Sequence, residues 1–290
     1  MNKLQKGIAV VGSTTIDTII DGDRRLLKMG GVTTYAGITY RRHGIPTHIV
    51  SNLAARDWKI VEKLAAEKLD VVWEASAQTT HFVNYINRQG RHQEVLQTAG
   101  PIEYGQIQKI INNVDGLHLG PLHPLDIAIS ALEALLNSNR SIFLDIQGYT
   151  REVKNQKVYR SISDRLTLGL TVAHTIKANR SEYQSMLNHF QMNLTELMIK
   201  FKIHETVVTL GDKGGFVQSQ SGELVNYAAE KADSLTDPTG TGDVFFAAYI
   251  VSRFSDQMQI HDACRYAARI AAEQVKGNYT TNDQLILEES

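Results

Sequence analysis

The sequence contains almost no cysteine: Cys264 is the only one in 290 residues. A single cysteine excludes an intramolecular disulfide and a cysteine-based metal cluster. Its scarcity fits a reducing compartment.

The sequence also has neither an excess of charge of one sign nor a long apolar run. The formal net charge is −1 at pH 7, so no electrostatic argument favours nucleic acid or an anionic membrane as a partner. No segment reaches the roughly 20 apolar residues that cross a bilayer, and none near the N-terminus is long enough for a signal peptide. We therefore expect a cytoplasmic protein that binds a small molecule, with neither nucleic acid nor a membrane as its partner.

Two phosphate-binding fingerprints are absent as well. The first strand-like segment is followed by residues 12–15, GSTT, which lack the Gly-X-Gly-X-X-Gly pattern of dinucleotide oxidoreductases, and no Gly-X-X-X-X-Gly-Lys-Ser/Thr loop occurs. A zinc site is disfavoured, because Pro121 and Pro124 prevent His118 and His123 from sharing one helical face.

Short β-branched segments alternate with helical patterns through most of the chain. This alternation predicts an α/β fold with a doubly wound, mainly parallel central sheet flanked by helices. We expect one domain over residues 1–290, since no repeat, low-complexity tract or linker interrupts it. The predicted central strands are residues 8–11, 48–51, 116–119, 142–146, 174–177 and 206–210. The predicted helices are residues 58–67, 106–113, 126–137, 194–201 and 260–275.

One region breaks the alternation. Residues 71–74, 81–87 and 93–97 have the pattern of consecutive strands, with the polar residues 88–91 as a turn between the last two. Such strands fit either a small β lid over an active site or an extension of the main sheet's edge.

The most informative motif is DPTGTGD at residues 237–243, which precedes an apolar helical run. Its glycines permit a tight turn, and free amides at a helix N-terminus attract phosphate oxygens. The carboxylate of Asp243 would then lie where it could accept a proton from a hydroxyl being phosphorylated. Taken alone, an N-cap that only stabilises a core helix explains this pattern equally well.

The full string resembles the C-terminal signature of the ribokinase-like (PfkB) carbohydrate kinases, usually DTTGAGD before a hydrophobic helix. Pro238 and Thr241 depart from that signature but leave the amides and the final Asp in place. The resemblance implies that Asp243 is the general base and that the backbone of Gly240, Thr241, Gly242 and Asp243 forms an anion hole. It also implies a lid built from about residues 19–31 and 71–98.

Two further motifs match the family in order. Residues 209–215, TLGDKGG, form a glycine-rich corner between strands, and the resemblance makes Thr209, Gly211 and Gly214 nucleotide-side candidates, although an ordinary turn explains them equally well. Asn179 and Glu182 have the spacing of a capping box, and they also resemble the family's Asn-X-X-Glu motif, which positions magnesium through water.

Candidate acceptor-binding residues lie beyond the ends of predicted strands, where ligands collect in doubly wound sheets. The resemblance assigns Asp17, Gly30 and Gly31 to substrate hydroxyls. Tyr35 occupies a position where many sugar-directed members have Asn, so ribose or fructose is not assumed. Further candidates are Asp145 and Gln147 as hydrogen-bonding groups, and Arg151 as either a phosphate contact or a surface charge.

These motifs predict an ATP- and Mg²⁺-dependent kinase that transfers the γ-phosphoryl group to a hydroxyl of a small sugar or cyclitol. A monovalent cation such as K⁺ is a further candidate cofactor, and a homodimer through the lid a candidate assembly. Two alternatives stay open. A nucleoside kinase of the same fold would use Phe82 or Tyr85 to stack on a base, and a non-catalytic nucleotide or sugar sensor would bind without turnover.

Overall fold

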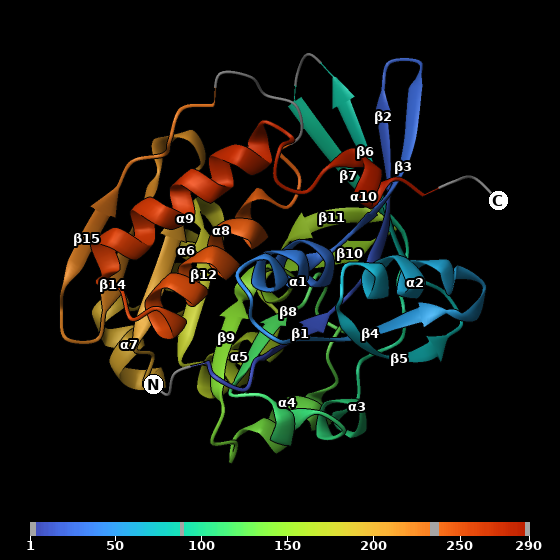
Figure 1. The fold of residues 1–290 in the computed structure, drawn as a ribbon. Helices are drawn as coiled ribbons and strands as arrows, with labels where there is room; N and C mark the ends of the chain where they lie inside the picture. The colour runs from blue at the N-terminus through green and yellow to red at the C-terminus, as the bar shows by residue number, and fades with distance from the viewer. Residues whose placement is uncertain (1–3, 88–89, 233–237, 288–290) are drawn as a thin grey trace.

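The computed structural model describes residues 4–87, 90–232 and 238–287, and its core is a nine-stranded sheet (Figure 1). Neighbouring strands are parallel except where β14 pairs with β13 and β15. In spatial order the strands are β15 (Leu224–Tyr227), β14 (Gly215–Ser219), β13 (Glu205–Thr209), β12 (Thr175–Asn179), β9 (Ser141–Asp145), β8 (Gly116–Gly120), β1 (Ile8–Gly12), β4 (Thr47–Ala54) and β5 (Asp70–Ser76). The predicted doubly wound α/β class is confirmed.

The central strands are buried along their whole length. Every residue of β1, β8 and β9 is buried, as expected for parallel strands covered on both faces. The strand order reverses at β1: β4 and β5 follow on one side, and β8 and the later parallel strands on the other. In doubly wound sheets, ligands bind beyond the carboxyl ends of the strands at such a reversal, which here means near Gly12 and Gly120.

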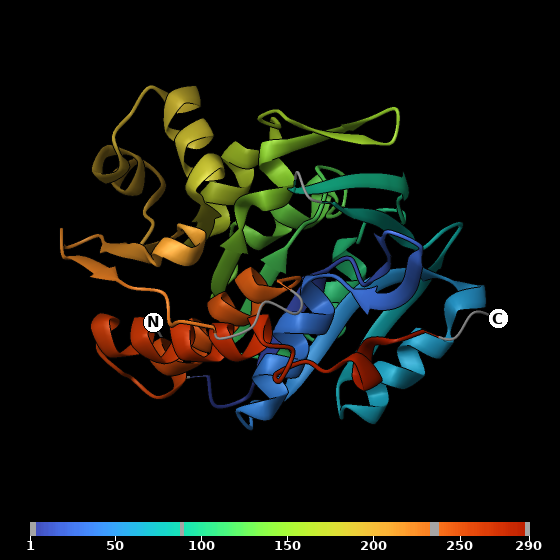
Figure 2. The same cartoon turned by 90° about the horizontal axis from the view of Figure 1, so that it is seen from above.

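Helices cover both faces of this sheet (Figure 2). One hydrophobic cluster joins the sheet to α1 (Val32–Arg42), α2 (Lys59–Ala66), α8 (Thr241–Ile250), α9 (Ile260–Val275) and α10 (Asn282–Leu285). A second cluster joins the other face to α3 (Tyr104–Gln108), α4 (Ile129–Leu135), α5 (Arg165–Val172), α6 (Arg180–Phe190) and α7 (Leu194–Phe201). Among the described residues, no helix is long and apolar enough to span a membrane.

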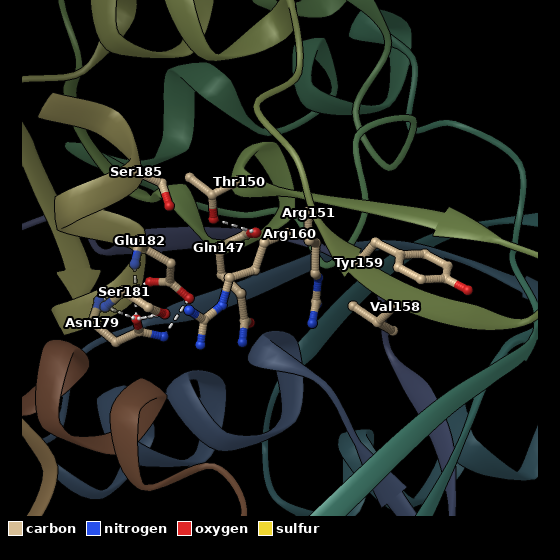
Figure 3. Close-up of a pocket in the computed structure, with 10 residues that line it drawn as sticks. All are labelled: Gln147, Thr150, Arg151, Val158, Tyr159, Arg160, Asn179, Ser181, Glu182 and Ser185. Carbon is tan, nitrogen blue, oxygen red and sulfur yellow. Dashed lines mark hydrogen bonds between the residues drawn. The ribbon is translucent and has the colours of Figure 1, made fainter. Parts of the chain in front are cut away.

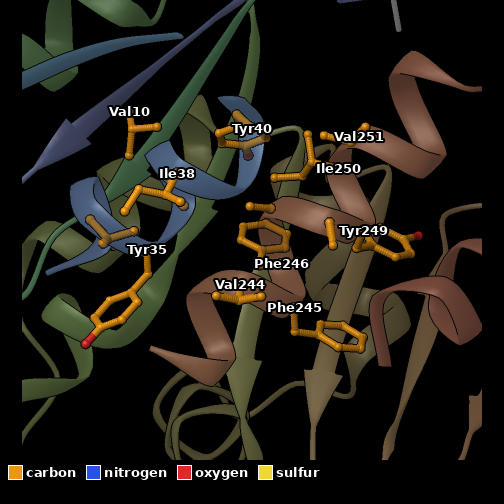
Figure 4. Close-up of a cluster of buried hydrophobic side chains, with 14 of the residues drawn as sticks. Val10, Tyr35, Ile38, Tyr40, Val244, Phe245, Phe246, Tyr249, Ile250 and Val251 are labelled. Carbon is orange, nitrogen blue, oxygen red and sulfur yellow. The ribbon is translucent and has the colours of Figure 1, made fainter. Parts of the chain in front are cut away.

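The helix α8 packs deep in the first cluster. Seven consecutive residues from Val244 to Ile250 are buried. Figure 4 shows Phe246 of α8 facing the side chains of α1, with Tyr35 at the opposite end of α1 from Tyr40. The position of the α8 N-terminus is therefore fixed by core packing.

A second, six-stranded sheet lies beside the main one (Figure 1). Only β2 and β6 pair in parallel. Its order is β10 (Arg151–Lys154), β11 (Lys157–Arg160), β7 (Gly90–Gln97), β6 (Thr80–Asn87), β2 (Thr15–Asp21) and β3 (Arg24–Gly30).

One expectation about this region needs correction, and one hairpin was not predicted. Residues 71–74 belong to β5, which pairs with β4 at the edge of the main sheet, because the long strand β4 offers a partner as far as Ala54. The hairpin β10–β11 was not expected, and it contributes the outer strands of the second sheet. Residues 88 and 89 of the predicted turn lie outside the described residues.

Short one-turn elements complete the chain. They are η1 (Ala55–Asp57), η2 (Ile111–Asn113), η3 (Ile146–Thr150), η4 (Gly211–Lys213) and a π-helical turn, η5 (Val251–Ser255). The predicted helices at 106–113 and 126–137 are correspondingly shorter, because the first splits into α3 and η2 and the second begins only at Ile129.

Candidate active site

The helix α8 begins at the motif predicted to bind an anion. Gly240 is its N-cap, with φ 73° and ψ −1°, a left-handed conformation that favours glycine. A Cβ at Gly240 would also overlap the ring of Tyr35. Asp243 lies in the first turn, where backbone N–H groups lack partners within the helix. Asp237, the first residue of the motif, lies outside the described residues.

Charged side chains converge beside this turn from four other elements. Asp145 ends β9, Lys177 lies on β12, Glu182 is in the first turn of α6, and Arg151 begins β10; all four are buried. The Nζ atom of Lys177 is 2.6 Å from Oδ2 of Asp145. This ion pair lies next to the first turn of α8, because a Cβ added at Gly242 would be 3.1 Å from Nζ.

The environment of Asp243 raises its pKa to about 7. Burial is the largest cause, and the carboxylates of Asp145 and Glu182 add to it, while Lys177 and Arg151 oppose it. A carboxyl group with this pKa can accept a proton near neutral pH. Burial likewise raises the pKa of Glu182.

Asn179 and Glu182 form a complete capping box at the start of α6. The Asn179 side chain accepts hydrogen bonds from the amides of Ser181 and Glu182, at 2.9 and 3.0 Å. Oε2 of Glu182 in turn accepts from the Asn179 amide at 2.7 Å. The helix cap thus holds both side chains at the rim of the site.

Arg151 is held in place by the loop that follows β8. Its Nε donates to the Leu122 carbonyl at 2.5 Å, and its guanidinium lies 5.7 Å from the centre of the Phe82 ring. The loop is fixed in turn by Asp126, which accepts from the Leu122 amide at 2.8 Å and from Ser13 Oγ at 2.6 Å. Arg151 therefore connects the main sheet to the second sheet.

Two adjoining cavities open over these residues. The Asp243 cavity has a volume of about 330 Å³, and the Asn179 cavity about 240 Å³. Gln147 and Arg151 line both, so the two cavities are adjacent, and Figure 3 shows the side chains that line the Asn179 cavity. The Asp243 cavity is lined by Thr15, Asp17, Gly31, Tyr35, Phe82, Gln93, Leu122, Gln147, Arg151, Thr239, Gly240 and Asp243. The Asn179 cavity is lined by Gln147, Thr150, Arg151, Val158, Tyr159, Arg160, Asn179, Ser181, Glu182 and Ser185.

Comparison with known proteins identifies the family of this chain. The family model described as "pfkB family carbohydrate kinase" matches residues 5–286. The chain belongs to this family.

Solved ribokinase-family structures share the fold of this pfkB family member at low sequence identity. A pyrophosphate-dependent kinase in the ribokinase family, complexed with a pyrophosphate analog and myo-inositol, is 20% identical with a TM-score of 0.80, covering 93% of this chain and 95% of that one. Ribokinase from Thermotoga maritima is 17% identical with a TM-score of 0.74, covering 96% and 97%. A Burkholderia thailandensis nucleoside kinase in complex with inosine is 15% identical with a TM-score of 0.77, covering 96% and 95%. No curated protein sequence matches significantly.

Most of the residues predicted from the pfkB signature meet at this cleft. Asp17, on β2, accepts a hydrogen bond from Thr15 Oγ1 at 2.7 Å. Gly30 lies behind it, since a Cβ there would overlap the Asp17 carboxylate, and Gly31 caps α1 against the carbonyl of Ser13. Gly30 therefore allows close packing around Asp17, and Gly31 allows close packing against Ser13.

Other predicted residues lie elsewhere. Thr209, Gly211 and Gly214 line neither of the two cavities described here and form the corner between β13 and β14. Gly211 and Gly214 have φ of 66° and 82°, so the turn itself requires glycine. Asp145 bonds to Lys177 instead of lining a cavity. Thr241 and Gly242 stand beside the cleft in the first turn of α8.

Several residues that line the two cavities were not predicted from the sequence. Thr15, Gln93, Leu122 and Thr239 line the Asp243 cavity, and Arg160 lines the other. Most come from the second sheet or from loops, where spacing along the chain gives no information about spatial neighbours. Lys177 did carry a signal, because a lysine inside the buried run TIKAN is unusual.

Proposed function

We propose that this protein is a kinase that transfers a phosphoryl group to a hydroxyl of a small polyol, with Asp243 as the general base. One observation carries the proposal. A carboxyl group with a pKa of about 7 lies in the first turn of a glycine-capped helix and lines a cavity of about 330 Å³. That volume falls in the usual range for small-molecule sites.

The lining of the Asp243 cavity suits a hydroxylated ring. Asp17, Gln93 and Gln147 offer hydrogen-bonding groups, while Phe82 and Tyr35 offer apolar surfaces. An acceptor held between them would present one hydroxyl to Asp243, which takes its proton as the oxygen attacks phosphorus. The amides at the start of α8 would stabilise the charge on the transferred group without having to reorganise. A sugar or a cyclitol fits this lining, and the inositol-bound neighbour makes a cyclitol the first acceptor to test.

The charge balance of the site supports a requirement for Mg²⁺. Among the described residues, four carboxylates stand around the two cavities, and three cations face them. The carboxylates are Asp17, Asp145, Glu182 and Asp243, and the cations are Lys177, Arg151 and Arg160. A polyanionic phosphoryl donor needs added positive charge there, and a divalent cation bound to its oxygens provides it. Among the described residues no group of three or more His, Cys, Asp or Glu could hold a metal by itself. As the family resemblance implies, Glu182 and Asn179 would position the metal through water.

ATP is the first candidate for the phosphoryl donor, with Thr209, Gly211 and Gly214 on the nucleotide side. Pyrophosphate is the second candidate, and a specific observation favours it. The Asn179 cavity, of about 240 Å³, presents the guanidinium groups of Arg151 and Arg160 together with Ser181, a composition suited to a small anion. K⁺ dependence and a homodimer through the lid stay predictions from the family resemblance.

A matrix of donors and acceptors tests the proposal. ATP and pyrophosphate, each with Mg²⁺, are paired with myo-inositol, ribose, fructose and inosine, and the phosphorylated product is quantified by mass spectrometry. We expect transfer to a cyclitol or a sugar. Transfer only to inosine would favour a nucleoside kinase, with Phe82 against the base. Binding without product across the matrix would favour a sensor and contradict the kinase proposal.

A further inference from the structure

Lys177 is a charged residue in the middle of a buried strand. It lies on β12 between Ile176 and Ala178, and its side chain is 7% exposed. Burying an ammonium group costs free energy unless it is paired and hydrogen-bonded. A central parallel strand that needs only to pack carries apolar residues. Packing of the strand therefore does not explain why a charged residue occupies this position.

The ammonium group lies against the first turn of α8. Its Nζ atom is 2.6 Å from Oδ2 of Asp145, and a Cβ added at Gly242 would come within 3.1 Å of Nζ. Gly242 has no left-handed conformation to maintain, so its turn does not require glycine. The missing side chain leaves room for the ammonium beside the amides that begin the helix.

A second polar group in this turn points to a ligand. Oγ1 of Thr241 is buried without a hydrogen-bond partner among the described residues. A buried hydroxyl without a partner costs free energy, and a bound phosphoryl oxygen would satisfy it. Thr241 therefore lies in the first turn of α8, and Lys177 approaches the same turn from β12.

The ionisable groups around Lys177 keep it charged. Burial alone would lower the pKa of Lys177, but the carboxylates of Asp145, Glu182 and Asp243 together raise it above its usual value. His118 also lies near this pair, and burial lowers its pKa to about 4, so it stays neutral at pH 7. Lys177 therefore remains an ammonium throughout the working pH range.

We propose that Lys177 is a catalytic residue of the phosphoryl transfer described above, donating a hydrogen bond to the transferred group from the side of Gly242. Asp145 is its positioning residue. An ammonium has three N–H donors, and the bond to Asp145 leaves two for phosphoryl oxygens. This inference rests on the proposed function.

The step needs no proton from Lys177. The bond between phosphorus and the leaving oxygen of the donor breaks, the bond to the acceptor oxygen forms, and the acceptor proton passes to Asp243. Lys177 stays protonated and offsets negative charge on the phosphoryl oxygens, as fixed cations do in other phosphoryl-transfer sites.

The first test compares Lys177→Met with Lys177→Arg. Removing one preorganised donor typically lowers kcat by roughly 10²–10³-fold, so we expect a loss of that size in Lys177→Met, with the acceptor KM little changed. Lys177→Arg keeps the charge and should retain more activity. Lys109→Met is the matched control, since it breaks an exposed ion pair with Glu74 and should leave kcat unchanged. A kcat for Lys177→Met within about threefold of wild type overturns the proposal.

A purely structural ion pair makes different predictions. Loss of either role would shift the acidic limb of kcat/KM to higher pH in Lys177→Met, because Lys177 lowers the pKa of Asp243. A purely structural ion pair would lower the melting temperature but leave kcat on the pH-independent plateau close to wild type, whereas the proposed role lowers that plateau. Lys177→Ala should also regain activity with added ethylammonium. A plateau kcat close to wild type with no amine rescue contradicts the proposal.

Gly242→Ala provides a test that leaves Lys177 in place. Its methyl group would push the ammonium away from the α8 N-terminus, so kcat should fall while the melting temperature stays close to wild type. If the effect acts through Lys177, the double variant with Lys177→Met should be no worse than Lys177→Met alone. Full additivity, or normal turnover in Gly242→Ala, counts against the contact.

The experiments distinguish a failure of the Lys177 proposal from a failure of the kinase proposal. If the wild type turns over and Lys177→Met matches it, only the role of Lys177 fails. If the wild type shows no turnover, calorimetry with pyrophosphate supplies the readout. We then expect about tenfold weaker binding in Lys177→Met, or 1.4 kcal/mol, and no change in Lys109→Met. Equal pyrophosphate binding by all three proteins overturns the inference.

Discussion

The ring of Tyr35 lies directly against Gly240, so that no side chain fits between α1 and the turn that begins α8. Tyr35 is 2% exposed and sits in the same hydrophobic cluster as Phe246. Tyr35, at a position where many sugar-directed family members have Asn, therefore packs against the turn that begins α8. It joins the wall of the Asp243 cavity to the core.

This contact predicts the outcome of Gly240→Ala. The variant combines an overlap with Tyr35 and a left-handed φ of 73°, so we expect it to lose more stability than the roughly 1–3 kcal/mol of backbone strain alone. Gly44→Ala is the control, because Gly44 has a φ of 74° and nothing within 4 Å of an added Cβ. Urea unfolding of both variants isolates the Tyr35 contact as the difference between them. Equal losses would show that the contact contributes nothing.

Asp243→Asn tests the general base. The amide keeps the size of the side chain but cannot accept the hydroxyl proton, so kcat should fall by roughly 10²-fold or more. Binding of the phosphoryl donor, measured by calorimetry, should persist because the backbone amides of α8 remain. Asp212→Asn, in the exposed turn η4, should behave as wild type. Near-normal turnover of Asp243→Asn would remove Asp243 from the mechanism.

The raised pKa of Asp243 predicts the pH dependence of the reaction. The base works only when ionised, and burial raises its pKa to about 7, so kcat/KM should fall about tenfold per pH unit below that value. An ordinary aspartate, with a pKa near 3.8, would leave the rate flat down to about pH 5. Initial rates between pH 5 and 9 distinguish the two profiles. A flat profile across this range would mean that a different group accepts the proton.

The central sheet could be predicted because its strands are short, buried and separated by helical patterns. Parallel strands covered on both faces carry a local signal in their own residues. The second sheet carries less signal. Its hairpin β10–β11 is polar and turns through Asn155 and Gln156, with φ of 50° and 64°, where the usual sequence signature is Asn-Gly.

Pairing between distant segments explains the remaining differences. The sequence of residues 71–74 is equally suited to either sheet, and only the free edge of β4 decides where it pairs. The residues of the candidate site fall into the same two groups, those with a local sequence signal and those without one. Asp243, Asn179 and Glu182 lie within motifs, whereas Gln93 and Phe82 reach the cavity across the junction of two sheets. The bond from Lys177 to Asp145 joins strands 32 residues apart in the chain.

Asn179→Ala separates a helix cap from a role in metal binding. The capping box of α6 is repeated at the start of α7 by Asn193 and Glu196, far from either cavity lining. Each Asn→Ala change removes the side-chain bond to the third helical amide and should cost about 1 kcal/mol of unfolding free energy. Asn179→Ala should cost somewhat more, because Asn179 also bonds to Ser181 and to Oε1 of Glu182. Only Asn179→Ala should raise the Mg²⁺ concentration needed for half-maximal activity, because only Asn179 stands beside the proposed phosphoryl donor. Titrating Mg²⁺ against both variants measures this difference, and the same Mg²⁺ requirement in Asn179→Ala, Asn193→Ala and wild type would leave Asn179 as a cap alone.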